Sequence, residues 1–235
     1  MERVSGQAAT LTPIRDAATL ILLDYSEGPA RVLMGRRHDG HKFMPGKFVF
    51  PGGAVDAADR RMAVAGPLDA RVSDKLLEKT RSRSPDFARG LALAAIRECF
   101  EETGLALGVA DHGAPPEPPP GWAEFAATGV FPTLEGLDFL ARAITPPGRT
   151  KRFDARFFAM DASWIVHRGE GVVHAEAELT QLVWVPLPDA LGLDIPDITR
   201  TILGDLAALG PRPWDPGRPR PLYRELHGKR LRETI

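Results

Sequence analysis

With 235 residues, the chain is long enough to bury a core as one decorated domain or as one domain with a small appendage. Hydrophobic residues make up 43% and charged residues 26%, a balance that excludes general disorder. The 30 basic and 31 acidic residues leave a net charge of −1, which provides no global attraction to nucleic acid or to an anionic membrane. We therefore expect no nucleic-acid and no membrane partner, and any recognition of phosphate must be local.

The only cysteine, Cys99, cannot form an internal disulfide, which fits a reducing compartment and excludes zinc sites built from several cysteines. We expect Cys99 to be a small packed residue rather than a reactive thiol. Residues 1–6 lack a basic region followed by an apolar run, and the longest apolar stretch, residues 17–23, is far shorter than a membrane span. The expected location is cytoplasmic.

The first part of the chain predicts three strands. Residues 17–23 form a continuous apolar run of strand length, and residues 31–35 follow a Glu-Gly-Pro turn and are predicted to be its hairpin partner. Residues 47–50 predict a short third strand, which Pro51-Gly52-Gly53 ends. Two successive glycines permit positive φ and a close approach of the backbone to a ligand.

A long helix is predicted after a charged segment. Residues 60–84 have an irregular pattern, although residues 68–79 are compatible with a short amphipathic helix. Ser84-Pro85-Asp86 provides a helix start, and Gly104 ends the helix predicted over residues 87–103. Its apolar residues centre opposite Glu98, Glu101 and Glu102 at 100° per residue, so we expect the acids to point away from its core.

The second half of the chain predicts fewer elements. Residues 113–121 are rich in proline and predict a stiff, exposed loop. Strands are predicted at residues 152–160 and 182–186, and a helix at residues 198–209, while residues 210–235 are expected to be an irregular tail of biased composition. Strands at both ends of the chain and well-marked helices between or after them indicate an α+β domain with a mixed sheet.

Glu98, Glu101 and Glu102 lie at i, i+3 and i+4 and so share one helical face. A glutamate-rich helix face is usually only solvated surface, but three carboxylates also form an incomplete cage of oxygen ligands for Mg²⁺ or Mn²⁺. Carboxylates this close repel one another without a cation, so metal affinity should fall in acid. Arg97 lies four residues before Glu101, the spacing of a helix-surface ion pair.

These residues resemble the signature of the Nudix hydrolases, G-x5-E-x7-R-E-U-x-E-E-x-G-U. Gly53 matches the first glycine and Asp59 the first acid, while the second half of the signature is matched by Arg97, Glu98, Glu101, Glu102 and Gly104. Arg97 follows Asp59 by 38 positions where the signature has 8, so about 30 residues interrupt the box. The resemblance implies one Nudix domain over residues 1–235, an α/β/α sandwich of a mixed sheet between helices, with an insertion at about residues 60–84.

The resemblance also implies roles for the site residues. Glu98, Glu101, Glu102 and the backbone of Gly53 would bind the metal, and Arg97 would orient a ligand carboxylate. Two candidates remain for the base that activates water, namely Glu98 and an acid later in the chain. The later candidate is Glu178, which lies shortly before Trp184, as the second glutamate does in many Nudix enzymes. Glu176 and Glu178 are equally compatible with surface acids.

Several segments outside the box resemble the coenzyme A diphosphatase branch of the family. They are residues 40–53, residues 56–60, the insertion, and residues 145–158. The implied reaction is cleavage of CoA or acyl-CoA to adenosine 3′,5′-bisphosphate and a 4′-phosphopantetheine product. A local rim of basic residues would bind the phosphates, and its members are Arg36, Arg37, Lys42, Lys47 and Arg152.

Other interpretations stay open at this point. The same metal helix with another pocket would hydrolyse ADP-ribose or a nucleoside-diphosphate sugar, and a non-catalytic Nudix module would only sense a nucleotide. The sequence leaves a homodimer open. His38 and His41 are interpreted as loop residues or phosphate donors, because no third metal ligand accompanies them.

Overall fold

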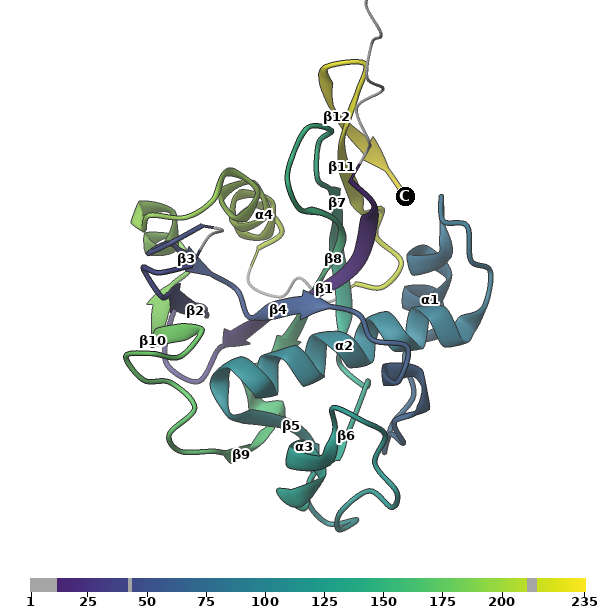
Figure 1. Cartoon of the computed structure of the whole chain (residues 1–235), viewed down its shortest axis with the longest axis vertical. Helices are drawn as coiled ribbons and strands as arrows, with labels where there is room; N and C mark the ends of the chain where they lie inside the picture. Colours follow the sequence, from purple (N-terminus) through teal and green to yellow (C-terminus); the bar gives the residue numbers. More distant parts are fainter. Residues whose placement is uncertain (1–11, 42–43, 211–214) are drawn as a thin grey trace, which may run out of the picture.

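A mixed β-sheet forms the centre of the computed structural model, which describes residues 12–41, 44–210 and 215–235 (Figure 1). In that part of the chain the sheet has nine strands. The main path runs in the order β10 (Leu179–Pro186), β2 (Arg31–Arg37), β1 (Ile14–Asp24), β8 (Arg152–Asp161), β7 (Asp138–Ile144), β11 (Pro221–Leu226) and β12 (Lys229–Thr234). Two short strands, β3 (Phe48–Val49) and β4 (Gly52–Ala54), pair with β2 and β1. The pairs β1/β8 and β7/β11 are parallel and the others antiparallel, so the sheet is mixed.

Helices cover both faces of this sheet. The long helix α2 (Pro85–Thr103) and the shorter α1 (Ala70–Leu77) share one core with Ala18, Leu20 and Leu22 of β1. Helix α4 (Asp197–Ala208) packs in a second core with Ile21 and Leu23 of the same strand. Strand β1 is buried on both faces, which explains its continuous apolar run. The expected α/β/α arrangement is confirmed.

A small second sheet lies beside α2 and carries the remaining short elements. Its order is β6 (Phe131–Pro132), β5 (Leu105–Val109) and β9 (Ile165–Arg168), and helix α3 (Ala123–Ala127) precedes β6. The sequence analysis did not predict these four elements or β7. All four are shorter than six residues, and β7 contains buried charged residues at Asp138 and Arg142, which obscure the strand pattern.

The ends of α2 follow the predicted capping chemistry. The side chain of Ser84 accepts a hydrogen bond from the Asp86 amide at 3.2 Å, and Pro85 occupies the first turn. Gly104 adopts the left-handed conformation with φ of 73°, and its amide donates to the Phe100 carbonyl at 2.8 Å. The predicted helix is confirmed, but it is not amphipathic in the expected way: it is buried on nearly all sides, and Glu102 is only 8% exposed.

The insertion is ordered and packs against α2. It opens with a 3₁₀ turn, Asp59–Arg61, and contains α1, which confirms the helix predicted over residues 68–79. Met62, Val72 and Leu76 of this segment join the core that contains α2. The insertion is therefore part of the same packed unit as the sheet.

The irregular tail expected over residues 210–235 is a wrong prediction for most of its length. Strands β11 and β12 form an antiparallel hairpin, and β11 adds a parallel pairing with β7 (Figure 1). The hairpin is closed by two backbone hydrogen bonds between Arg220 and Ile235, at 2.7 and 2.9 Å. Proline and arginine around it obscure the strand pattern in the sequence, and the pairing partner lies about 80 positions earlier.

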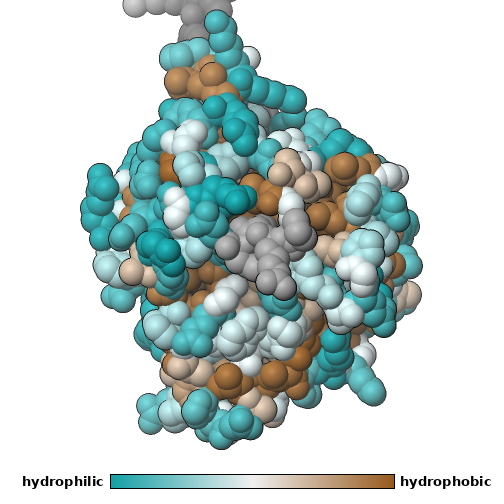
Figure 2. Space-filling view, turned by 180° about the vertical axis from the view of Figure 1, so that it is seen from behind, coloured by the Kyte–Doolittle hydropathy of each residue, from teal (hydrophilic) through white to brown (hydrophobic). Residues whose placement is uncertain are grey.

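The surface seen in Figure 2 has apolar residues scattered among hydrophilic ones. Among the described residues, the most exposed large apolar side chains are Ile14 at 46% and Val166 and Leu226 at 44% each. Scattered exposure of this kind is ordinary for a folded domain. No helix within the described ranges is long and apolar enough to cross a bilayer.

The C-terminal hairpin should depend on a buried ion pair. Arg220 is 1% exposed, and its Nη2 lies 2.9 and 2.7 Å from the two carboxylate oxygens of Asp138, which is 3% exposed. Arg220→Ala would leave the buried carboxylate of Asp138 without its cationic partner, so we expect a loss of about 3–5 kcal/mol in the free energy of unfolding, measured with urea. Arg218→Ala is the matched control, because Arg218 is partly exposed and 3.9 Å from Asp215; equal losses in both variants would contradict the prediction.

Candidate active site

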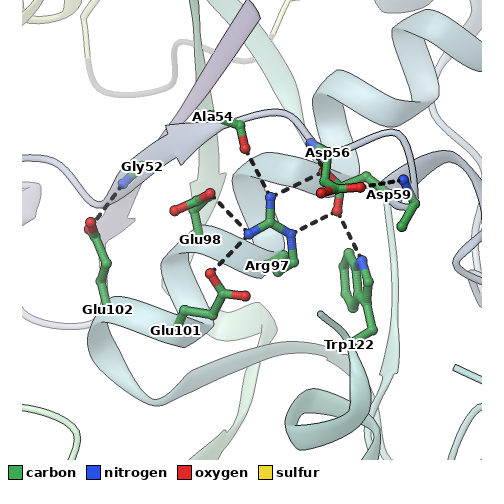
Figure 3. A network of polar contacts seen from close by, with 10 residues as sticks. Gly52, Ala54, Asp56, Asp59, Arg97, Glu98, Glu101, Glu102 and Trp122 are labelled. Carbon is green, nitrogen blue, oxygen red and sulfur yellow. Dashed lines mark hydrogen bonds and ion pairs between the residues drawn. The ribbon is translucent and has the colours of Figure 1, made fainter. Parts of the chain in front are cut away.

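The glycine turn at Gly52-Gly53 lies directly against α2. Strand β4 pairs with β1, with Gly53 opposite Ala18. A Cβ at Gly53 would collide with the carboxylate of Glu98, so a larger residue there would displace that carboxylate. The amide of Gly52 donates a hydrogen bond to a carboxylate oxygen of Glu102 at 3.1 Å (Figure 3). The two segments that match the halves of the Nudix signature are therefore in contact.

Asp59 and Arg97 join the same two segments through a buried ion pair. Asp59 is fully buried, and its carboxylate accepts from Arg97 Nε at 2.7 Å and Nη2 at 3.1 Å. Arg97 Nη2 also donates to the carbonyl of Ala54 at 3.0 Å (Figure 3). The structure thus brings Asp59 to Arg97 across the insertion, despite their separation of 38 positions.

Arg97 also orients two glutamates of α2. Its Nη1 lies 2.9 Å from Glu98 Oε1 and 2.9 Å from Glu101 Oε2, which confirms the Arg97–Glu101 pair expected from spacing. Burial alone would lower the pKa of Arg97, but the hydrogen bonds and charge of Asp59, with Glu98 and Glu101, raise it. Arg97 is therefore a permanent cation that holds both carboxylates in place.

Burial makes the glutamates of α2 unusual acids. It raises the pKa of Glu98 to about 7, although Arg97 acts in the opposite direction, and it raises the pKa of Glu101. The pKa of Glu102 is raised well above its ordinary value by burial first and then by the negative charges of Glu178 and Glu98. Two buried carboxylates beside each other are electrostatically unfavourable when ionised, and a divalent cation would relieve this.

The donor set fits a hard cation such as Mg²⁺ or Mn²⁺, since it consists of oxygen atoms only. The structure does not gather all three glutamates, however: within the described ranges, no three His, Cys, Asp or Glu side chains are grouped closely enough to hold a metal. Glu102 contacts the Gly52-Gly53 turn and Glu101 contacts Arg97, whereas Glu98 contacts both (Figure 3). Helix spacing predicted that the three glutamates share one face, but it did not predict that they contact different partners.

Glu178 lies directly before β10, which carries Trp184, and its negative charge raises the pKa of Glu102. Its carboxylate forms an ion pair with Arg37 at 2.9 Å. Glu176 differs, because its side chain is 83% exposed and contacts His174 instead. The structure therefore separates the two acids that the sequence left equivalent and brings Glu178 to the side of the site.

The expected basic rim is only partly assembled around the glutamates. Arg37 lies beside Glu178, Arg36 pairs with Asp39 at 2.8 Å, and Lys47 pairs with Asp194 at 2.6 Å. Lys42 lies outside the described residues. His38 accepts a hydrogen bond from the Gly40 amide, which supports its interpretation as a loop residue.

Arg152 does not belong to this rim. It is opposite Ile14 in the parallel pairing of β8 with β1, whereas Gly53 is opposite Ala18, four residues further along β1. That separation corresponds to about 13 Å along the strand. Arg152 instead donates to the carbonyl of Thr145 at 3.2 Å. The positive charge of Arg152 suggested phosphate binding, but the register of β8 with β1 places the residue away from the glutamates.

Trp122 is a residue of the site that the sequence analysis missed. Its indole Nε1 donates to Asp59 Oδ1 at 3.0 Å, and both residues are fully buried. The only sequence signal was a tryptophan directly after the proline-rich stretch, where a large apolar residue is unusual for an exposed loop.

Comparison with known proteins supports the fold. No family model matches the chain. The solved structure of a NUDIX hydrolase from Alicyclobacillus acidocaldarius is 28% identical, with a TM-score of 0.63 over 84% of this chain and 92% of that one. The NUDIX domain of Shewanella oneidensis NrtR, solved with ADP ribose, is 13% identical over 84% of this chain and 88% of that one, with a TM-score of 0.48.

Among curated proteins, human acyl-coenzyme A diphosphatase NUDT19 is 28% identical over 54% of this chain. The chain spans about half the length of this relative, since the match covers 47% of it. The fold is that of the Nudix hydrolases, a mixed sheet between helices with the signature residues gathered at α2. The similarity supports hydrolase function.

The raised pKa of Glu98 predicts a pH-dependent difference in stability. In the metal-free folded protein Glu98 binds its proton more tightly than in the unfolded chain, where its pKa is 4.5. Its stabilising contribution is therefore complete below pH 4.5 and is lost as the pH rises through about 7. Relative to Glu98→Gln, the wild type should lose about 3 kcal/mol of unfolding free energy between pH 4.5 and pH 8, measured with urea and a chelator. A difference that does not change with pH would contradict this.

Proposed function

We propose that this chain is a metal-dependent Nudix diphosphatase that cleaves CoA or acyl-CoA to adenosine 3′,5′-bisphosphate and an (acyl-)4′-phosphopantetheine. The observation that carries the proposal is the contact between the two halves of the signature, with Gly53 against Glu98 and Asp59 paired with Arg97. The CoA assignment is supported by the partial similarity to the human acyl-CoA diphosphatase.

Hydrolysis of a diphosphate requires charge neutralisation, because the negative oxygens repel a nucleophile. Bound Mg²⁺ or Mn²⁺ supplies this neutralisation and lowers the pKa of water. We propose Glu98, Glu102 and the backbone of Gly53 as ligands, because the two carboxylates flank that turn. Glu101 is the third carboxylate that we propose, since it projects from the same turn of α2 as Glu98 and its side chain is 40% exposed.

The residues of the chain have separate tasks in the proposed reaction. Arg97 keeps Glu98 and Glu101 oriented through its Nη1. Glu178 is our candidate for the group that takes the proton from the attacking water, because its negative charge acts on Glu102 and it is not held by Arg97. Glu98 is the second candidate, since a pKa of about 7 suits proton transfer near neutral pH.

Arg36, Arg37 and Lys47 are proposed to contact the phosphates of the substrate. Their present partners are the carboxylates of Asp39, Glu178 and Asp194, which an anionic phosphate would replace or share. Arginine binds phosphate oxygens through two parallel hydrogen bonds, and lysine acts as a compact point charge. The local basic rim thus attracts the anionic substrate, whereas the net charge of −1 of the whole chain does not.

A substrate panel tests the proposed activity. We expect CoA and acetyl-CoA to be hydrolysed with Mg²⁺ or Mn²⁺ faster than ADP-ribose, NADH or nucleoside triphosphates, with products identified by mass spectrometry. Glu102→Gln should abolish turnover of every substrate by removing a proposed ligand, whereas exposed Glu176→Gln should not. Inert CoA beside rapid ADP-ribose turnover would reject the CoA assignment, and full activity of Glu102→Gln would reject the metal site.

The choice of proton acceptor is tested with two neighbouring acids. Glu178→Gln should lower kcat by about 100-fold or more, the usual contribution of a general base, with a smaller change in KM. Glu176→Gln is the matched control in the same loop and should stay within about twofold of the wild type. Nearly full kcat in Glu178→Gln would assign the proton to Glu98 instead.

A further inference from the structure

We propose that Trp122 is a positioning residue of the active site, which orients Glu98 and Glu101 through Asp59 and Arg97. The expected effect on kcat rests on the proposed function, whereas the contacts of Trp122 do not depend on it. Trp122 lies outside the Nudix signature, 63 positions after Asp59 and 25 positions after Arg97 in the chain.

The carboxylate of Asp59 is completely satisfied, and Trp122 provides one of its four donors. Asp59 Oδ1 accepts from Arg97 Nε at 2.7 Å and from Trp122 Nε1 at 3.0 Å. Asp59 Oδ2 accepts from Arg97 Nη2 at 3.1 Å and from the Asp56 amide at 2.8 Å. A carboxylate has about four lone-pair sites, so this arrangement fixes the plane of the group as well as its position.

Such support is needed because the box is interrupted. The residue at position 59 is an aspartate, one methylene shorter than the glutamate of the signature, and the insertion begins at this residue. The connection from Asp59 to α2 is therefore long, and tertiary contacts must hold the carboxylate in place. The indole supplies a contact from a third segment, between the proline-rich loop and α3.

Trp122 is itself rigidly held against α2. Its amide donates to the Pro119 carbonyl at 3.0 Å, and its ring meets Phe125 edge-on at 5.2 Å. Phe125 in turn meets Phe100 of α2 at 5.2 Å, also edge-on. The indole is thus anchored to the same helix that carries the glutamates.

The preceding residue, Gly121, helps Trp122 to cover Arg97. Gly121 has φ of 86°, a conformation that favours glycine, and a Cβ there would lie 3.5 Å from Arg97 Cδ. Arg97 is only 7% exposed under this cover. Exclusion of water strengthens the hydrogen bonds from Arg97 to Glu98 and Glu101.

Loss of the indole N–H should disturb the carboxylates without removing any of them. One lone pair of buried Asp59 would be left without a donor, which allows Asp59 and Arg97 to rotate. Because Arg97 Nη1 holds both glutamates, both would shift together. Small displacements of catalytic groups have large effects on rate, whereas substrate affinity depends on other contacts.

The test removes the N–H while keeping the ring. Trp122 is replaced by benzothienylalanine, which retains the bicyclic shape and has sulfur in place of N–H, and separately by phenylalanine. Mn²⁺ affinity is measured by calorimetry, and kcat and KM are measured on the substrate that the panel identifies. We expect both replacements to lower Mn²⁺ affinity and kcat about tenfold or more, with KM within about twofold.

Two matched controls separate positioning from packing. Trp164→Phe makes the same change at a half-buried tryptophan that does not contact Asp59, and both readouts should stay unchanged. Phe125→Leu loosens the aromatic packing and keeps the indole N–H, so it should lower Tm but change Mn²⁺ affinity less than the Trp122 replacements.

The outcomes distinguish this inference from the proposed function. Wild-type Mn²⁺ affinity after benzothienylalanine replacement, or equal losses of Mn²⁺ affinity in Phe125→Leu, would overturn the positioning role. If the wild type hydrolyses no substrate of the panel, the proposed function fails, while the Mn²⁺ affinities still decide the role of Trp122.

Discussion

The buried ion pair between Asp59 and Arg97 is the contact on which the arrangement of the site depends. Asp59 is fully buried and Arg97 is 7% exposed, so removal of Arg97 would leave the buried charge of Asp59 without its cationic partner, at a cost of about 3–5 kcal/mol. The pair connects the glycine turn and the start of the insertion to α2. Through Arg97 it also determines where Glu98 and Glu101 point. Trp122 extends the same network to a segment that no signature includes.

The insertion changes the physical character of α2. The inserted segment packs against the helix and contributes Met62, Val72 and Leu76 to the core that they share. Near the C-terminal end of the helix, Glu98 and Glu102 are desolvated against the Gly52-Gly53 turn, and their pKa values rise. Desolvated carboxylates destabilise the metal-free fold at neutral pH and favour binding of a divalent cation. Stability is thus lowered where the proposed chemistry takes place, as is common at functional sites.

Local signals predicted much of the fold. The apolar run of β1, the cap residues Ser84 and Gly104 and the turn at Gly52-Gly53 each depend on a few neighbouring residues, so the sequence states them directly. The strands β7, β11 and β12 were missed, because Asp138 of β7 and Arg220, directly before β11, are charged residues that are buried only after they pair with each other. Arg152 was placed in the phosphate rim by its charge, whereas the register of β8 with β1 places it elsewhere.

The sequence by itself determined the identity of the box residues, the length and caps of α2, and the presence of an interruption of about 30 residues. Only the tertiary structure decided that Asp59 reaches Arg97, that Glu102 meets the glycine turn while Glu101 meets Arg97, and that Glu178 rather than Glu176 faces the site. The reason is the range of the interactions. Helix periodicity and capping act over about four residues, whereas the contacts of the site join positions 38 to 63 residues apart and form only when the core packs.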